Sequence, residues 1–248
     1  DINNHIRELE TKEREEIARI LKELSGEVGH SVRSIVNNQK YLTRLDVIFA
    51  KARMSIEMNC TAAEISEDGV LDIRQGRHPL IDPEKVVPLD ITAGRTYRTL
   101  IITGPNTGGK TVALKTAGLL MLMNQSGMHV PAAPGTVLPV MESIYADIGD
   151  EQSIEQSLST FSAHMKNIVE ITENADENTF VLLDELGAGT DPAEGAALAM
   201  SVLEFLRKKG SMIFATTHYS ELKKYALSTE GVENASMEFD VETLSPTY

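Results

Sequence analysis

Residues 97–118 read YRTLIITGPNTGGKTVALKTAG, and this stretch decides the fold class. Thr99–Thr103 is a short run of apolar and β-branched residues, typical of a strand in a sheet that is covered on both faces. A glycine-rich segment, Gly104–Thr111, follows directly, and a helical pattern of apolar residues then occupies positions 111–126. This order of strand, loop and helix is the context in which the pattern GxxxxGK[ST] forms a phosphate-binding loop.

The glycine-rich loop predicts a site for a nucleoside phosphate. Backbone N–H groups can point toward an anion only where side chains do not crowd them, and the N-terminus of the following helix adds partial positive charge. Lys110 would neutralise the β- and γ-phosphates, and the Thr111 hydroxyl would bind Mg²⁺. The residues expected around the phosphates are Gly104, Pro105, Asn106, Thr107, Gly108, Gly109, Lys110 and Thr111. We therefore expect ATP and Mg²⁺ as ligands; a glycine-rich connection that binds nothing is the alternative.

An acidic pair supplies a second part of the expected site. Asp184 and Glu185 directly follow Thr179–Leu183, which reads as a buried strand. Strand ends are where α/β sheets bind ligands, so Asp184 would hold Mg²⁺ through water. Glu185 would polarise the water that attacks the γ-phosphate. The alternative is that both acids lie at a strand end by chance.

Two further residues distinguish subclasses of such sites. His218 ends the strand-like segment Phe214–His218, from which it could reach the γ-phosphate and sense its loss; a surface histidine is the alternative. Ser159 lies at the start of a helical pattern over 159–173. Such hydroxyls are usually N-caps and nothing more, but a helix N-terminus is also an anion site.

Strands and helices alternate over most of the chain, which indicates an α/β sheet covered on both faces. Asp191, Pro192 and Glu194 form a helix start, with Asp191 as the N-cap, and Gly210 ends that helix. The expected strands are Val86–Ile91, Thr99–Thr103, Thr179–Leu183 and Ser211–Thr216, and the expected helices are Thr111–Ser126, Ser159–Glu173 and Pro192–Lys209.

The N-terminal part differs from the rest, and we divide the chain into a helical arm, residues 1–58, and an ATPase domain, residues 59–248. One apolar stripe runs along the arm, which therefore needs a partner surface. Glycines near Ser25–Gly29 predict a kink or break there. Beyond the arm, Asp68-Gly69 lies between two period-two segments and predicts a β-hairpin.

Composition limits the possible partners. The net charge of −14 argues against broad nucleic-acid contact by this part of the protein. Residues 31–56 hold five basic groups and a single acidic one, Asp46. These basic groups form either a phosphate-facing stripe or a solvated helix face.

No apolar run approaches the ~18 residues of a membrane span. The lone Cys60 fits a reducing cytoplasm, and the absence of an initial Met suggests a piece of a longer protein.

Six motifs, in this order and spacing, resemble the MutS family of ABC-type ATPases over nearly the whole chain. They are GRHPLI at 76–81, TGPNTGGKT at 103–111, GMHVPA at 127–132, LSTF at 158–161, LLDELGAGTD at 182–191 and ATTHY at 215–219. Within the family, DELGAGTDPAEGAALA and DEQSIEQSLSTFSAHM are similar to the second-type branch, MutS-two. Mismatch-repair members instead have DEIGRGT and GRSTF at these places.

The resemblance implies a P-loop fold of the ABC type, with a mixed sheet flanked by helices and preceded by a long helical arm. In such ATPases two nucleotides are sandwiched between two chains, so a homodimer is implied. Ser159 would then reach the γ-phosphate in the partner subunit, and Asp191 would communicate across the interface. Asn106 would border the nucleotide. The residues implied near the adenine are His78, Pro79 and Leu80.

The resemblance also implies an ATP-driven motor whose arm leads to a clamp. The branch is linked to branched DNA and suppression of homologous recombination, and also to splitting of collided ribosomes; these 248 residues do not decide between the two. Any endonuclease activity would lie outside this part of the protein. A nucleotide-gated module with negligible hydrolysis is a further alternative, although Glu185 favours hydrolysis. A kinase or helicase fits less well with Ser159 and His218.

Overall fold

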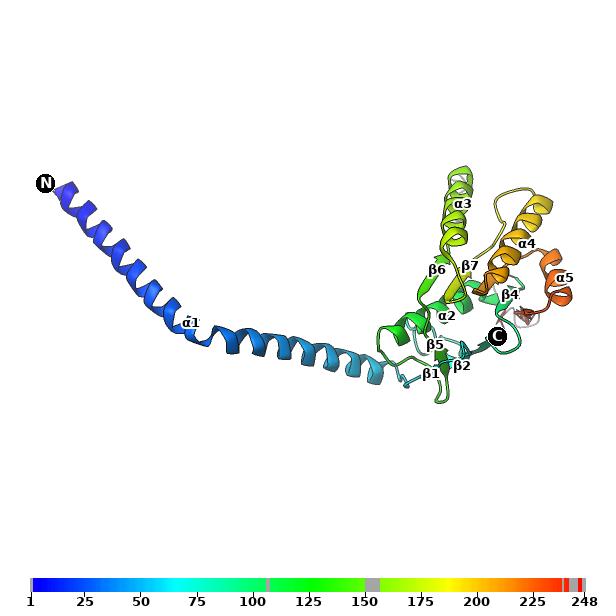
Figure 1. Ribbon diagram of the computed structural model, residues 1–248, viewed down its shortest axis with the longest axis horizontal. Helices are drawn as coiled ribbons and strands as arrows, with labels where there is room; N and C mark the ends of the chain where they lie inside the picture. Colours follow the sequence, from blue (N-terminus) through cyan, green and yellow to red (C-terminus); the bar gives the residue numbers. More distant parts are fainter. Residues whose placement is uncertain (1, 106–107, 150–156, 238, 241–244, 247–248) are drawn as a thin grey trace. The chain divides into compact units, whose positions relative to one another are not determined.

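The computed structural model describes residues 2–105, 108–149, 157–237, 239–240 and 245–246 of the chain. The contacts between residues divide the chain into two compact units, Asp1–Arg53 and Met54–Tyr248. The first unit is part of a single helix, and the second contains every strand found among the described residues (Figure 1).

The long helix α1 spans Ile2–Glu57, and its 56 residues are assigned to one element without interruption. Of the predicted kink or break near Ser25–Gly29, the break is therefore absent, whereas Figure 1 shows that the helix bends partway along, which agrees with a kink. A Cβ added at Gly26 or Gly29 would meet no atom within 4 Å, so these glycines cost helix propensity but cause no clash.

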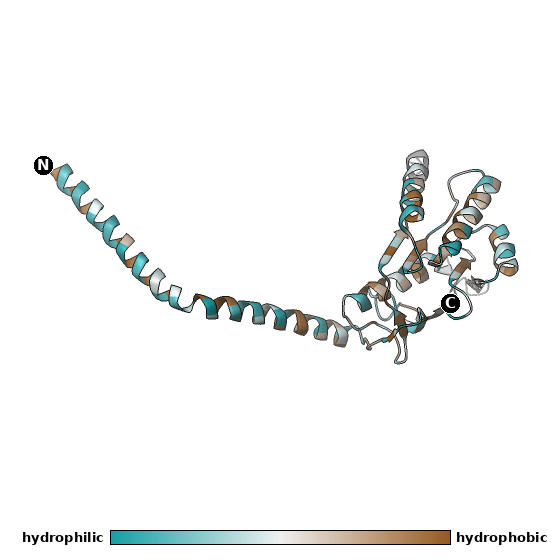
Figure 2. Cartoon of the chain, in the orientation of Figure 1, coloured by the Kyte–Doolittle hydropathy of each residue, from teal (hydrophilic) through white to brown (hydrophobic). Residues whose placement is uncertain are grey.

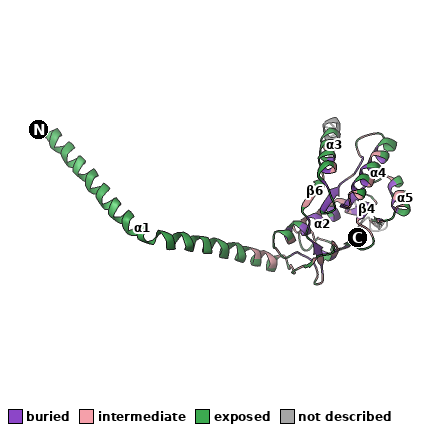
Figure 3. Ribbon diagram, viewed as in Figure 1, coloured by how far each residue is buried: buried purple, intermediate pink, exposed green. Residues whose placement is uncertain are grey.

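None of the described residues of α1 is buried. Pairs one turn apart stabilise its surface, such as Lys12 with Glu8 at 2.7 Å and Arg19 with Glu23 at 3.0 Å. Large hydrophobic residues recur along α1 and are exposed. Figure 2 colours the helix by hydropathy, and Figure 3 shows most of its length as exposed. The apolar residues that the sequence predicts along the arm are thus exposed in the described part of α1.

The second unit is built on a five-stranded sheet in the order β6-β7-β8-β4-β9. Every pair of neighbours in it is parallel. The carboxyl ends of all five strands therefore lie on one edge of the sheet, and this edge is where parallel α/β sheets place their ligands. The strands are β4 (Thr99–Thr103), β6 (Ser143–Asp147), β7 (Thr179–Leu183), β8 (Met212–Thr216) and β9 (Val232–Ser236).

Helices cover both faces of this sheet, as expected. Side chains alternate along each strand: Leu100 and Ile102 pack into one apolar core, whereas Ile101 packs into the other. Helix α2 (Lys110–Gln125) covers the first face together with a second sheet. Helices α3 (Ser157–Asn174), α4 (Pro192–Lys208) and α5 (Ser220–Ser228) cover the second face.

A smaller mixed sheet has the order β1-β5-β2-β3, formed by Glu64–Ser66, Val137–Pro139, Leu71–Gly76 and Leu89–Ala93. The hairpin predicted at Asp68-Gly69 is wrong, because β5 inserts between the two flanking strands and β2 pairs with β3 instead. Gly69 does adopt a positive φ of 72°. The chain does turn at Asp68-Gly69, but the strands on either side pair with strands from other parts of the chain and not with each other.

The remaining strands, β10 (Phe239–Asp240) and β11 (Ser245–Pro246), form a two-stranded antiparallel sheet. Across the described residues, no helix is both long enough and apolar enough to cross a membrane.

Candidate functional site

The glycine-rich loop connects β4 to α2 at the carboxyl edge of the sheet. Gly104 has a φ of 126° and Gly109 a φ of 83°, and residues that carry a Cβ rarely adopt such backbone angles. A Cβ on Gly108 would lie 3.0 Å from the Cβ of Met237, which packs behind the loop. The carbonyl of Pro105 accepts the N–H of Gly108 at 3.0 Å. Glycine is therefore required here by backbone conformation and by close packing.

Two predicted loop residues, Asn106 and Thr107, lie outside the described residues. Their expected contacts with a nucleotide stay predictions.

Lys110 is the first residue of α2 and is 1% exposed. Its Nζ donates a hydrogen bond to the carbonyl of Gly104 at 2.6 Å, so the side chain folds back over the loop. Burial lowers the pKa of Lys110, and the nearby carboxylates of Glu185 and Asp184 partly oppose that shift. A buried ammonium group at the mouth of a phosphate loop is stabilised when an anion binds beside it.

The next residue along α2 connects the loop to the acidic pair. The Thr111 hydroxyl donates to Oδ1 of Asp184 at 3.2 Å, and the Thr216 hydroxyl donates to the same oxygen. Asp184 is 7% exposed. A hydroxyl and a carboxylate are hard oxygen ligands of the kind that Mg²⁺ binds, and Mg²⁺ usually keeps waters and substrate phosphates as its other ligands.

The protein ligands present fit Mg²⁺ on this chemistry. Within the described ranges, no group of three or more His, Cys, Asp or Glu side chains is arranged to hold a metal ion. A site completed by phosphate oxygens needs no such group.

Glu185 takes an unusual backbone conformation for its residue type, with a φ of 48°. Its N–H donates to the Thr216 hydroxyl at 2.8 Å, which fixes the turn after β7 to the end of β8. Its Oε1 lies 3.4 Å from Nε2 of His218. The structure therefore brings together Glu185 and His218 from the ends of two neighbouring strands.

Asp191 lies farther along the same loop, as the N-cap of α4. Its Oδ1 accepts the N–H groups of Ala193 at 2.9 Å and Glu194 at 3.3 Å, so the predicted capping is confirmed. The loop is held by a close approach of two glycines: a Cβ on Gly195 would lie 2.3 Å from the carbonyl oxygen of Gly187.

Ser159 belongs to the first turns of α3 by its backbone, and its side chain lies outside the described part of the chain. Its predicted role in a partner subunit stays a prediction.

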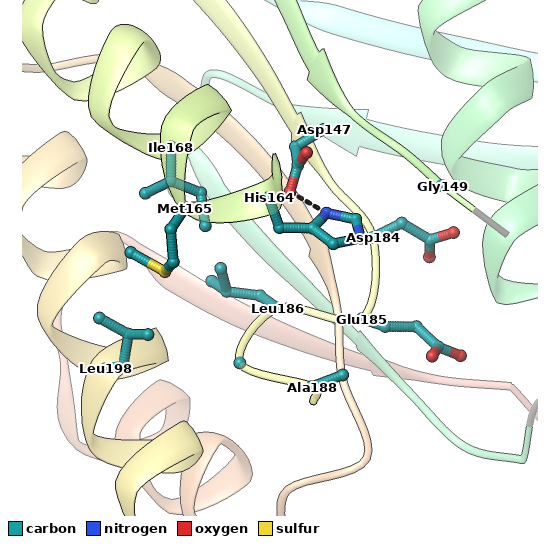
Figure 4. Close-up of a pocket in the computed structure, with 11 residues that line it drawn as sticks. Asp147, Gly149, His164, Met165, Ile168, Asp184, Glu185, Leu186, Ala188 and Leu198 are labelled. Carbon is teal, nitrogen blue, oxygen red and sulfur yellow. Dashed lines mark hydrogen bonds and ion pairs between the residues drawn. The ribbon is translucent and has the colours of Figure 1, made fainter. Parts of the chain in front are cut away.

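A pocket borders the acidic pair on the side of α3, and Figure 4 shows the residues that line it. Besides Asp184 and Glu185, its polar lining includes Asp147 at the end of β6 and His164 on α3. Nδ1 of His164 lies 2.8 Å from Oδ2 of Asp147. Sequence reasoning missed both residues and also Thr216.

His78 and Leu80 line a separate, largely apolar groove along α2, which also includes Val112 and Lys115. Burial lowers the pKa of His78, and the positive charge of Lys115 adds to the shift. Leu80 is 80% exposed. Pro79 lies between them in a turn in which the N–H of Leu80 donates to Nδ1 of His78 at 3.2 Å. Val112 and Lys115 belong to the first turns after the loop, so this groove begins close to it.

The chain resembles known proteins over its whole length. Residues 100–247 match the family model described as MutS domain V. The chain is 62% identical to the Endonuclease MutS2 of Clostridium acetobutylicum, 60% identical to that of Acetivibrio thermocellus and 59% identical to that of Caldanaerobacter subterraneus subsp. tengcongensis. These matches cover 100% of this chain but 32%, 31% and 31% of the relatives.

The chain thus spans about a third of the length of the curated relatives it matches. The family match covers the central sheet from β4 onward, including the loop, the acidic pair and His218. The helix α1 and the smaller sheet's first strands precede it. On the matched residues, the chain belongs to the family of proteins that contain MutS domain V, the ATPase domain of MutS proteins.

Proposed function

We propose that the chain is the ATPase region of a MutS2 protein, which binds ATP with Mg²⁺, hydrolyses it and drives a clamp located elsewhere in the full protein. One observation carries the proposal: Thr111 on α2 donates to Asp184 after β7, beside a carboxylate, Glu185, that contacts His218 after β8. The phosphate loop and the acidic pair are thus parts of one site.

The loop residues would bind the nucleotide. Gly104–Thr111 present backbone N–H groups at a helix N-terminus, and Lys110 is already folded over the loop by its bond to Gly104. When phosphate oxygens replace that carbonyl as its partner, the buried ammonium gains a full counter-charge. Asn106 and Thr107 would complete the cradle.

Thr111 and Asp184 would hold Mg²⁺, which when bound neutralises charge on the β- and γ-phosphates. The Thr111 hydroxyl is close enough to Asp184 to share one ion with it, directly or through water. Thr216 keeps the carboxylate oriented by its own hydroxyl hydrogen bond.

Glu185 would orient and deprotonate the attacking water. Its backbone is fixed by Thr216, and its carboxylate lies at the pocket's rim beside His218. His218 would contact the γ-phosphate and respond to its release. A carboxylate in this place supports hydrolysis over a module that only binds nucleotide.

The second half of each site would come from a partner subunit. By the family resemblance, Ser159 would contact the γ-phosphate bound by the partner, and Asp191 would signal across the interface. The helix α3 has 18 residues and begins at Ser157, so its N-terminus can favour an anion. We therefore propose a homodimer that closes on ATP.

The adenine would lie near the groove that begins at His78, Pro79 and Leu80. Its lining is mainly apolar and includes Val112 and Leu119 from α2. Because the pKa of His78 is lowered, its ring is neutral at physiological pH and can pack against a base without bringing charge.

For the whole protein we propose that residues 1–58 form an arm leading to a clamp on branched or recombining DNA, and that residues 59–248 form the ATPase domain. The exposed apolar side chains of α1 support an arm that packs against other parts of the full protein. The relatives are named endonucleases. We place that activity outside these residues.

The deciding test of hydrolysis is Glu185→Gln, which keeps the size of the side chain and removes its charge. We expect phosphate release to fall at least ~100-fold while binding of a fluorescent ATP analogue stays within a few-fold of the unchanged chain. Phosphate release and analogue binding are both measured at a protein concentration at which sedimentation shows that the chain forms dimers. Unchanged phosphate release would reject Glu185 as the base.

The clamp's substrate is tested in the full-length protein that carries Glu185→Gln, in which ATP is bound but not hydrolysed. Crosslinking in cells followed by sequencing should recover branched DNA. Recovery of ribosomal RNA without DNA would reject the DNA proposal and favour action on collided ribosomes.

A further inference from the structure

Asp147 connects helix α3 to the strand that precedes the acidic pair. It ends β6, lies opposite Leu183 of β7 and is 4% exposed. Its backbone carbonyl accepts the N–H of Asp184 at 2.9 Å. Its carboxylate accepts hydrogen bonds from Nδ1 of His164 at 2.8 Å and from Nδ2 of Asn167 at 3.0 Å. A single residue thus contacts the acidic pair through its backbone and α3 through its side chain.

A buried carboxylate is costly unless hydrogen bonds replace its lost water. Here α3 supplies two donors, His164 and Asn167, which lie three residues apart and hence on one face of the helix. If α3 shifted along the sheet, Asp147 would lose both donors. The cluster therefore resists any movement of α3 relative to the strand end.

The orientation of the His164 ring follows from the same contact. A carboxylate only accepts hydrogen bonds, so Nδ1 carries the proton and, in the neutral ring, Nε2 is an acceptor. The ring lines the pocket that Asp184 and Glu185 also line (Figure 4). A Cβ on Gly149 would lie 3.2 Å from Cε1 of His164, so a glycine leaves room for the ring there.

We propose that His164 is a positioning residue of the ATPase site. Its hydrogen bond to Asp147 holds α3, the helix that begins with Ser159 near its N-terminus, in a fixed relation to the edge formed by Asp184 and Glu185. A displacement of α3 by a partner subunit's nucleotide is then passed through Asp147 to the N–H of Asp184. This inference rests on the proposed ATPase function, because it assigns His164 to the coupling of its two halves.

Two substitutions of His164 distinguish the contributions of its two nitrogens. Asn places an amide N–H near the position of Nδ1 and keeps the bond to Asp147, whereas Gln places its amide near the position of Nε2 and loses that bond. Lys166→Ala, an exposed position on the same helix, is the matched control.

In steady-state assays of phosphate release we expect His164→Gln to lower kcat at least ~10-fold with KM for ATP within ~3-fold, since positioning acts on the reaction and not on nucleotide binding. His164→Asn should retain at least about half of kcat, and Lys166→Ala should match the unchanged chain. Wild-type kcat in His164→Gln, or equal losses in the Asn and Gln variants, would overturn the proposal.

Hydrogen–deuterium exchange without nucleotide gives a second readout. His164→Gln should raise exchange in residues 162–170 and at the amide of Asp184, whereas His164→Asn should not. Unchanged exchange in His164→Gln would overturn the proposal even if kcat falls. If the unchanged chain releases no phosphate, the proposed function fails, and exchange still decides whether His164 fixes α3.

Misfolding is checked by thermal melting. If His164→Gln melts far below Lys166→Ala, the same assays are made on Asn167→Ala. That variant lacks one of the two donors to Asp147 and keeps the His164 imidazole. A normal kcat together with normal exchange in Asn167→Ala would then count against the cluster.

Discussion

The hydroxyl of Thr111 lies 3.2 Å from Oδ1 of Asp184, although 73 residues separate them in the chain. Thr111 is the last residue of the glycine-rich loop after β4, and Asp184 follows β7, which lies two positions from β4 in the sheet order. Parallel pairing of β4, β8 and β7 brings their carboxyl ends to one edge, and so brings the two side chains together. The sheet topology therefore brings together the two residues of the proposed Mg²⁺ site.

Replacing Thr111 by Val removes the hydroxyl and keeps the shape, whereas Ser keeps the hydroxyl. We expect Thr111→Val to raise the Mg²⁺ concentration needed for half-maximal phosphate release at least ~10-fold, and Thr111→Ser to stay near the unchanged chain. A Mg²⁺ titration of phosphate release measures this. Identical titrations for Val and Thr would show that the hydroxyl is not a ligand.

Lys110→Met should weaken ATP binding by at least ~10-fold, because a charged hydrogen bond to phosphate is lost. Without nucleotide the variant should be at least as stable as the unchanged chain, since it no longer buries an ammonium group.

The difference in unfolding free energy between Lys110→Met and the unchanged chain should also depend on pH in a defined direction. The pKa of Lys110 is lowered in the folded chain, so the penalty for burying the charge is present at neutral pH and disappears as the pH rises through the folded value toward 10.5. The stability advantage of Lys110→Met should shrink over that range in urea titrations. A constant difference would show that burial does not destabilise the charged form.

Mixing two inactive variants tests the proposed dimer. Ser159→Ala removes the hydroxyl that is proposed to act on the partner's nucleotide, and Lys110→Ala removes the proposed phosphate contact in its own subunit. A mixed dimer should contain about one competent site and regain phosphate release that neither variant shows alone. With mixed dimers demonstrated by sedimentation, no recovery would reject the role of Ser159 in the partner's site.

Gly195→Ala should destabilise the chain by about 1–3 kcal/mol, because its Cβ would lie 2.3 Å from the backbone oxygen of Gly187 and neither backbone segment can move freely. The control is Gly26→Ala, whose Cβ meets nothing within 4 Å and which should slightly favour the helix. Urea unfolding measures both. Equal unfolding midpoints for the two variants would contradict the close approach.

The hydrogen bonds around Glu204, which lies away from the candidate site, predict that the folded chain loses stability in acid. Hydrogen bonds from Arg207, Tyr225 and Lys208 lower the pKa of its carboxyl to about 2. A lowered carboxyl pKa stabilises the folded state above the unfolded value near 4.5 and loses that effect as the pH falls toward 2. The difference in unfolding midpoint between Glu204→Gln and the unchanged chain should vanish over that interval. Glu170→Gln, at an exposed position, should show no such trend.

Elements with strong local signals were predictable from the sequence. Thr99–Thr103 and Thr179–Leu183 are strands with the predicted bounds, because full burial on both faces requires a continuous run of apolar and β-branched residues. Asp191 at the start of α4 was predictable because capping chemistry is local.

Features that depend on distant residues were not predictable. The Asp68-Gly69 turn gave no information that β5 would separate its two strands. His164 lies within the motif DEQSIEQSLSTFSAHM, but its contact with Asp147 depends on how α3 packs on β6. The helix α1 bends but does not break for another reason: two exposed glycines lower helix propensity by an amount that the rest of a long helix offsets.

The left-handed backbone at Glu185 lowers the stability of the fold at a residue that we propose as the base for ATP hydrolysis. At a φ of 48° a side chain with a Cβ costs roughly 1–2 kcal/mol relative to glycine. Glu185→Gly removes that strain, offset in part by the greater freedom of glycine in the unfolded chain, and it would also remove the carboxylate that we propose as the base. Directed evolution of thermal resistance from this chain therefore has to screen for phosphate release at every round, because a glycine at residue 185 would relieve the backbone strain and also remove the proposed base.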